Sequence, residues 1–160
     1  MKWLIVEDAL KDRKGHWGEY VDTFRSGLKA RGDAVTVLAE RHAESYILNW
    51  PDTYAVLPDS IWHRMSDQAS RWKRLARIPY HGFQTQKTIQ NWLKSQPLPD
   101  VIFVPTVLVH HLLGWWRIYE SCLKHTPTKL LLFFPNAPLN EMAIEGAPGL
   151  RTDPSSRLFH

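Results

Sequence analysis

Short apolar runs alternate with longer amphipathic stretches along this chain. The runs predict β-strands covered on both faces, because strands of a parallel sheet read as continuous hydrophobic segments. Residues 54–58, "YAVLP", are a further candidate strand in the middle of the chain. The clearest runs lie at Trp3–Val6, Ala34–Ala39, Val101–Val104 and Lys129–Phe134.

Helices are predicted where apolar residues recur every three or four positions. The first such stripe comprises Trp17, Val21, Phe24 and Leu28. Gly32 ends that helix, and Pro97 closes a second one over Gln84–Ser95. Residues 61–80 are expected to be helical in part, and Thr106 is the predicted N-cap of the last helix. That helix is expected to be well buried through Leu108, Leu112, Trp115, Trp116, Tyr119, Cys122 and Leu123.

This order of elements predicts an α/β domain around a mostly parallel sheet. At 160 residues the chain has the length of one domain. From Pro135 onward the pattern dissolves, yet the final "DPSSRLFH" looks like a cap and the first turn of a helix. We therefore expect a single domain over residues 1–160 that belongs to a longer parent protein.

Basic residues exceed acidic ones by 20 to 16, and the net charge of +4 is mild for a nucleic-acid-binding protein. The excess is concentrated in "RWKRLAR", which holds Arg71, Lys73, Arg74 and Arg77. Such a segment either binds an anionic lipid surface or a phosphate-bearing acceptor, or forms a solvated helix face with Trp72 packed inward.

Cysteine content and hydropathy favour a cytoplasmic protein. The single cysteine, Cys122, excludes an internal disulfide and a thiolate metal cluster. The apolar run after Lys2 is too short for a signal peptide, and no stretch approaches the roughly 20 apolar residues of a membrane span. Peripheral contact with the inner face of the membrane remains open through the basic segment.

The acidic pair Glu7-Asp8 follows the first strand, as in response-regulator receiver domains, which it resembles at this point. A receiver also needs an aspartate at the tip of a later strand, where this chain has Pro105. The closing lysine after the last strand is absent as well, since Pro135 and Asn136 stand there. Glu7 and Asp8 are therefore interpreted as a solvated strand end, and a receiver-like signalling domain is kept only as an alternative.

Gly15 and Gly18 lie between the first strand and the first helix, where open parallel sheets bind ligands. Glycine lets the backbone approach a ligand closely, and the N-terminus of a helix offers free N–H groups. Their spacing is not that of the G-x-G-x-x-G dinucleotide motif.

Taken with the strands, this loop resembles the N-terminal half of a GT-B glycosyltransferase of the family 4 type. The resemblance covers most of residues 1–136 in outline, with a poor match over about 43–83, and Asp33 stands where histidine is usual. The positions that match the pattern of the family are Gly15, Gly18, Leu28, Gly32, Val35 and Val37.

The resemblance implies a Rossmann-like, doubly wound sheet and the acceptor-binding half of an enzyme that transfers a sugar from a nucleotide sugar to an acceptor hydroxyl. The acceptor would be a sugar or a lipid-linked molecule. The donor-binding domain, with its glutamate pair, would lie beyond residue 160 or on a partner chain, so this chain alone would not be active. The resemblance implies no bound metal and no cofactor in this chain.

Candidate site residues follow from their places in the sequence. His16 is the candidate catalytic base, because a histidine in the first loop can accept a proton near neutral pH. One of His110 and His111 is expected to face the cleft. In the family a histidine often follows the fifth strand, where this chain has Asn136. The candidate acceptor-binding residues are Gly15, Gly18, Glu19, Thr106, His110 and Asn136.

Each candidate also has a structural interpretation: Glu19 would stabilise the start of its helix, and Thr106 would cap the next one. A rival function is a stand-alone binding module that uses the basic segment for anionic lipid or, less expectedly, nucleic acid. Salt-dependent binding that is lost when Arg71, Lys73 and Arg74 become alanine would favour the module.

Overall fold

The computed structural model describes residues 1–12, 16–60, 71–108 and 111–134, and the side chains of residues 16 and 71–76 also lie outside the description. The strands are β1 (Lys2–Val6), β2 (Ala34–Glu40), β3 (Thr53–Leu57), β4 (Val101–Val104) and β5 (Lys129–Leu132). The helices are α1 (His16–Ala30), α2 (Ser45–Leu48), α4 (Arg71–Ser95) and α5 (Leu112–Ile118), and α5 continues into a π-helical turn over Tyr119–Leu123.

The five strands form one parallel sheet in the order β3-β2-β1-β4-β5, which confirms the predicted α/β, Rossmann-like fold. The candidate strand at residues 54–58 is confirmed as β3. Receiver domains have the order 2-1-3-4-5, so the topology argues against the receiver alternative. With β1 in the centre, the chain moves outward first to one side and then, from β4, to the other.

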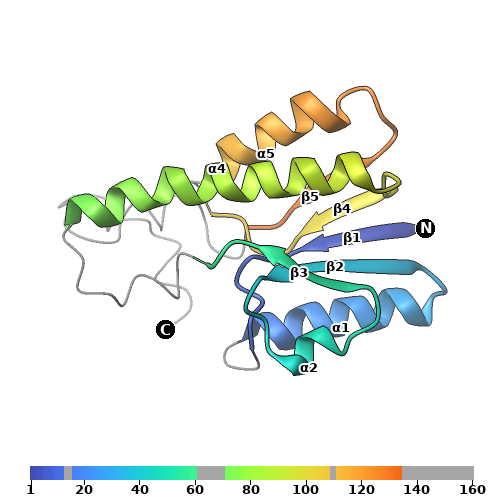
Figure 1. The fold of residues 1–160 in the computed structure, drawn as a ribbon. Helices are drawn as coiled ribbons and strands as arrows, with labels where there is room; N and C mark the ends of the chain where they lie inside the picture. Colours follow the sequence, from blue (N-terminus) through green and yellow to red (C-terminus); the bar gives the residue numbers. More distant parts are fainter. Residues whose placement is uncertain (13–15, 61–70, 109–110, 135–160) are drawn as a thin grey trace, which may run out of the picture.

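Helices cover both faces of the sheet, α4 and α5 on one and α1 and α2 on the other (Figure 1). Alternate residues of each strand therefore enter two separate cores: Leu4 and Val6 pack with α4 and α5, and Ile5 packs with α1 and α2. In β4, Ile102 belongs to the first core and Phe103 to the second. Continuous apolar strands were predicted for this reason, since neither face is left to water.

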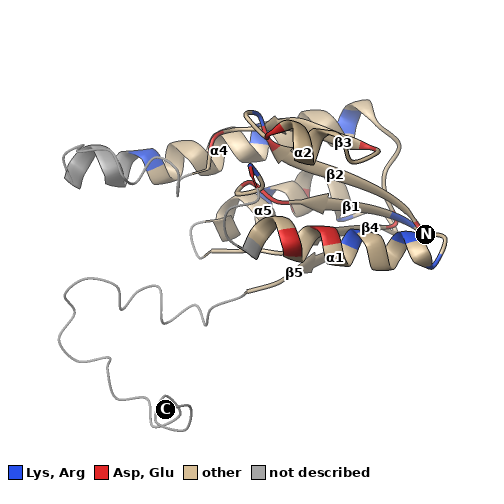
Figure 2. Cartoon of the chain, turned by 90° about the horizontal axis from the view of Figure 1, so that it is seen from below, with Lys and Arg blue, Asp and Glu red and all other residues tan. Residues whose placement is uncertain are grey.

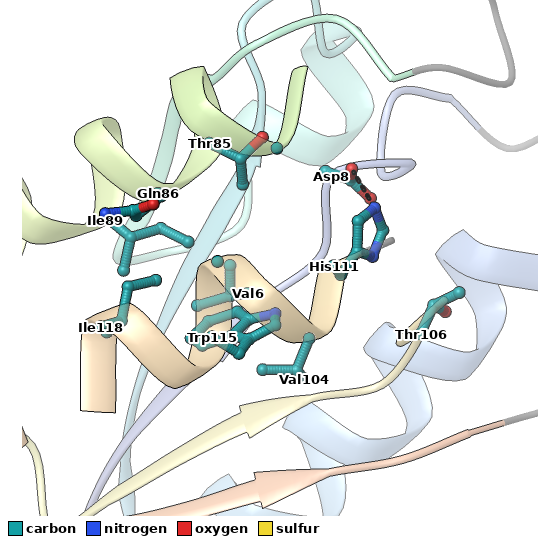
Figure 3. A pocket seen from close by; sticks show the side chains of 12 residues that line it. Val6, Asp8, Thr85, Gln86, Ile89, Val104, Thr106, His111, Trp115 and Ile118 are labelled. Carbon is teal, nitrogen blue, oxygen red and sulfur yellow. Dashed lines mark ion pairs between the residues drawn. The ribbon is translucent and has the colours of Figure 1, made fainter. Parts of the chain in front are cut away.

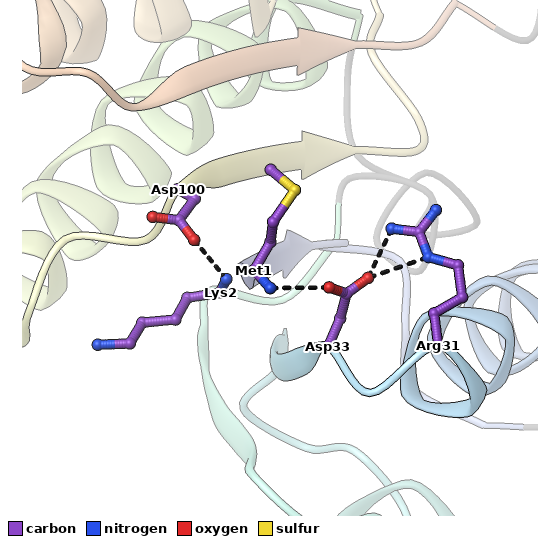
Figure 4. Close-up of polar contacts among 5 residues, drawn as sticks. All are labelled: Met1, Lys2, Arg31, Asp33 and Asp100. Atoms are coloured by element: carbon purple, nitrogen blue, oxygen red, sulfur yellow. Dashed lines mark hydrogen bonds and ion pairs between the residues drawn. The ribbon is translucent and has the colours of Figure 1, made fainter.

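The start of β1 is held from both sides (Figure 4). The ammonium group of Met1 lies 2.8 Å from Asp33 Oδ1, and the Lys2 N–H donates to Asp100 Oδ2 at 2.7 Å. Arg31 also donates to Asp33, and these hydrogen bonds lower the pKa of Asp33. Asp33, which departs from the family pattern, thus has a structural role at the end of the sheet opposite the predicted ligand site.

The stripe predicted for α1 is confirmed, with Val21 and Leu28 buried. Gly32 ends the helix in the left-handed region (φ 83°), as predicted. The Asp33 N–H donates to Leu28 O at 3.1 Å and the Gly32 N–H to Lys29 O at 2.9 Å, which is the pattern of a Schellman motif.

Gly32→Ala is therefore expected to lower the free energy of unfolding by about 1 kcal/mol, because alanine resists a positive φ. Urea unfolding measures this change. Gly27→Ala is the matched control: it lies inside α1, its added Cβ meets nothing within 4 Å, and it is expected to gain about 0.5–1 kcal/mol. Equal effects of both substitutions would contradict the assigned cap.

The later helices differ from the prediction. α4 begins at Arg71, well before Gln84, and runs through Pro79, although proline usually interrupts a helix. α5 begins only at Leu112 with His111 as its N-cap, so the prediction that Thr106 caps this helix is wrong. α5 is also less buried than expected, because it lies on the outer face of the molecule beside α4: Trp115 and Ile118 are buried, but Trp116 is 59% exposed.

In the described part of the chain no helix is long and apolar enough to cross a membrane. Acidic and basic residues are interspersed over the elements drawn in Figure 2. Arg77 is half-buried in α4, while the side chains of Arg71, Lys73 and Arg74 lie outside the described residues, so the anionic-surface hypothesis for this segment stays a prediction.

Candidate functional site

The order of strands reverses between β1 and β4, which makes the gap between their carboxyl ends the place where such sheets bind ligands. Asp8 lies two residues beyond β1 and Thr106 two residues beyond β4. The two strands pair in parallel register, Ile5 opposite Phe103, so both residues emerge at the same edge of the sheet. Glu7 and Thr106, which follow these two strands, are both buried polar residues.

Asp8 lies between two histidines that come from different helices. Its Oδ2 atom is 3.5 Å from His81 Nε2 on α4 and 3.7 Å from His111 Nε2 at the start of α5. The side chains of His81, His111 and Asp8 are only 7%, 10% and 11% exposed. The two imidazole rings are 6.1 Å apart between centroids, so both face the same carboxylate.

His111 is held with its Nδ1 side toward the backbone. The Leu108 N–H lies 3.4 Å from Nδ1, which leaves Nε2 as the nitrogen nearest Asp8. Burial lowers the pKa of His111 from 6.5 to about 4, and a backbone hydrogen bond with Thr106 only partly offsets this effect. His111 is therefore neutral at pH 7, with one nitrogen able to accept a proton, a hydrogen bond or a metal ion.

Glu7, the other member of the acidic pair, is 1% exposed and carries its proton at neutral pH. Burial raises its pKa from 4.5 to about 8, and the negative charge of Asp8 adds to the rise. The Thr106 side chain and the Ala9 N–H, which lies 3.1 Å from Glu7 Oε1, oppose the shift only in part. The interpretation of Glu7-Asp8 as a solvated strand end is therefore wrong: Glu7 is fully buried, and the Asp8 side chain is only 11% exposed.

A small cavity opens beside the cluster (Figure 3). Asp8 and His111 lie side by side at one end of it, and Ile89 and Ile118 lie at the other. Its volume of about 20 Å³ has room for one water molecule or one hydroxyl group. Thr85 Oγ1, on the wall of the cavity, is buried and has no hydrogen-bond partner among the described residues. A polar group in the cavity would therefore find unused hydrogen-bonding capacity.

Thr106 is buried and lines this cavity, and its contact with an acceptor stays a prediction. Glu19 does not line it: it is exposed on α1, which covers the opposite face of the sheet. Gly18 was expected in a loop, but it is the third residue of α1 and is buried, so it cannot offer the bare backbone of a turn.

Other predicted site residues lie outside the description. These are Gly15, His110 and Asn136, and of His16 only the backbone, the first residue of α1, is described. Their proposed contacts with an acceptor stay predictions.

His81 and Asp8 are the site residues that the sequence analysis missed. His81 gave no signal, because it lies in the middle of a helix whose face toward the sheet could not be assigned from periodicity through Pro79. Asp8 did give one: a carboxylate directly after the first strand of a parallel sheet stands at the ligand-binding edge.

Comparison with family models, curated proteins and solved structures finds no match to this chain. The chemistry of the site is therefore argued from its geometry. A carboxylate beside a neutral imidazole can orient that ring and accept hydrogen bonds from a hydroxyl group. Two imidazoles and a carboxylate that converge can also bind a divalent metal ion.

Proposed function

We propose that this chain is the acceptor-binding half of a glycosyltransferase, and that the acceptor hydroxyl binds between the carboxyl ends of β1 and β4. The observation that carries this proposal is the pairing of Asp8 with His111 beside a cavity at the point where the strand order reverses. The resemblance of residues 1–136 to the family 4 enzymes supplies the class of reaction. The fold agrees with that resemblance but is shared by many other functions.

The size of the cavity favours a hydroxyl group as the part of the acceptor that enters. About 20 Å³ is too small for a sugar ring, so the ring would remain outside with one hydroxyl inserted. Thr106 and Asp8 line the cavity and offer oxygen atoms to that hydroxyl. Asp8 can take the proton that the hydroxyl loses as the bond to the sugar forms, and neutral His111 orients that carboxylate through Nε2, 3.7 Å from Asp8 Oδ2.

The donor half, bound to a nucleotide sugar, would close over this edge from beyond residue 160 or from a partner chain. His16 is the first residue of α1, which covers the face of the sheet opposite α4 and α5. Its predicted catalytic role stays a prediction. No observation in the described residues favours the lipid-binding or nucleic-acid-binding module over this proposal.

Titration of the isotope-labelled chain with methyl glucoside, methyl mannoside and methyl N-acetylglucosaminide tests the proposal by NMR. We expect amide shifts at Asp8, Thr106 and Gly114, which border the cavity, and no comparable shifts with a nucleotide sugar, because its site would lie on the missing half. Shifts confined to other surfaces, or binding of the nucleotide sugar alone, would contradict the proposal.

Thr106→Val is expected to weaken glycoside binding roughly three- to tenfold, since it removes one hydroxyl from the cavity while keeping its shape. Thr23→Val, on the exposed surface of α1, is the matched control and is expected to bind like the wild type. An equal loss in both variants would mean that the effect does not come from the cavity.

A further inference from the structure

We propose that Asp8, His81 and His111 bind one divalent transition-metal ion, with Zn²⁺ the best fit. One ligand atom from each of these side chains lies within 4.8 Å of the other two. No metal ligands were predicted from the sequence, because the two histidines and the aspartate are far apart along the chain. The site goes beyond the proposed function, which needs no metal.

Two of the three ligand separations are close to those around a zinc ion, and the third, between the two histidines, lies within 4.8 Å. Zinc bonds to nitrogen and oxygen of about 2.0–2.2 Å, arranged as a tetrahedron, place neighbouring ligand atoms roughly 3.3–3.5 Å apart. Asp8 Oδ2 lies 3.5 Å from His81 Nε2 and 3.7 Å from His111 Nε2. Binding would therefore need shifts of only a few tenths of an ångström in these two separations.

The ligands are also held in place before any ion binds. They come from the segment after β1, from the long helix α4 and from the start of α5, and each side chain is about nine-tenths buried. Nδ1 of His111 lies toward the backbone, 3.4 Å from the Leu108 nitrogen, so Nε2 is the ring atom that faces Asp8. A metal ion at Nε2 takes the ring tautomer whose proton is on Nδ1. A preorganised site loses little side-chain entropy on binding.

The donor atoms select the class of metal. Two imidazole nitrogens with one carboxylate oxygen suit Zn²⁺ and its transition-metal neighbours, whereas Mg²⁺ and Ca²⁺ prefer oxygen ligands throughout. Three protein ligands leave a fourth position for water or another oxygen. Because Asp8 and His111 also border the cavity, that oxygen can come from a molecule bound there. Only this last step rests on the proposed function.

Calorimetric titration of the chelator-treated chain with ZnSO₄ tests the proposal. We expect one ion per chain, and at least a tenfold loss of affinity in Asp8→Asn, His81→Gln and His111→Gln. His125→Gln is the matched control, since His125 is exposed and outside the cluster. MgCl₂ is expected not to compete. Circular dichroism of each variant shows whether it has folded.

The wild-type chain keeps the test decisive even where a variant unfolds. Its melting temperature is expected to rise with ZnSO₄ and not with MgCl₂, and Co²⁺ is expected to give the visible absorption bands of a site with nitrogen ligands. Absence of stoichiometric binding, or full affinity in all three folded variants, would overturn the proposal. If zinc does not bind but the glycosides still shift the amide signals, the proposed function stands without the metal site. If zinc binds but the glycosides cause no shifts, the proposed function is rejected and the metal site stands.

Discussion

Glu7→Gln is expected to remove most of the decrease in the free energy of unfolding that the wild type shows between about pH 5 and pH 8. In the unfolded chain this carboxyl ionises near pH 4.5, but in the folded protein burial and the charge of Asp8 raise its pKa to about 8. The folded state therefore binds more protons than the unfolded state in this window, so stability falls as the pH rises through it and levels off above about 8.

The expected size of this effect is large. A rise from 4.5 to about 8 corresponds to a loss on the order of 5 kcal/mol at alkaline pH, at about 1.4 kcal/mol for each pH unit. Glutamine cannot ionise, so the variant should avoid most of that loss and match the wild type within about 1 kcal/mol at pH 5. Urea unfolding at several pH values, with chelator in all buffers, measures both profiles.

His111 acts in the opposite sense and must be separated from Glu7. Its lowered pKa means that the unfolded chain binds the extra proton between about pH 4 and 6.5, so its contribution to stability is lost as the pH falls. This contribution is common to both proteins and cancels in their difference. Glu44→Gln, which removes an exposed carboxylate, is the matched control. Parallel profiles for wild type and Glu7→Gln would show that Glu7 is ionised in the folded protein.

Ile102→Ala is expected to destabilise the domain by roughly 2–5 kcal/mol, a large share of the stability of a domain this size. Ile102 is fully buried in β4, the strand between β1 and β5, and packs in the core beneath α4 and α5. The substitution leaves a cavity that rigid neighbouring strands cannot fill. The midpoint of urea unfolding, at pH 7 with an unchanged slope, measures the loss.

Leu131→Ala is the matched control for this core. Leu131 lies in the edge strand β5 and is 45% exposed, so its truncation should cost less than about 1 kcal/mol. Comparable losses at both positions would mean that β5 is covered in solution by chain outside the described residues. A small effect at Ile102 would contradict the assigned core.

The sequence by itself determined the elements and the class of the fold. Trp3–Val6 and Val101–Val104 were predicted as buried strands, and the end of α1 at Gly32 was predicted as well. These features depend on local chemistry: a continuous apolar run needs cover on both faces, and only a residue that tolerates a positive φ ends a helix in this way.

Local patterns failed wherever burial depends on a distant segment. Glu7 looks like a solvated strand end in the sequence but is 1% exposed in the fold, and Trp116 looks like part of a buried stripe until α5 is seen to contact the molecule on one side only. Thr106 has the character of a helix cap, yet the helix begins six residues later, at Leu112. In each case the neighbour that decides the outcome is remote in the sequence.

Only the tertiary structure assembled the candidate site. Asp8 is 73 residues from His81, and His81 is 30 residues from His111, so no spacing motif could connect them. The parallel topology brings the carboxyl ends of β1 and β4 together, and the packing of α4 against α5 then places both imidazoles over one carboxylate. Sequence fixes which residues are able to do chemistry, whereas the crossovers between parallel strands decide which of them meet.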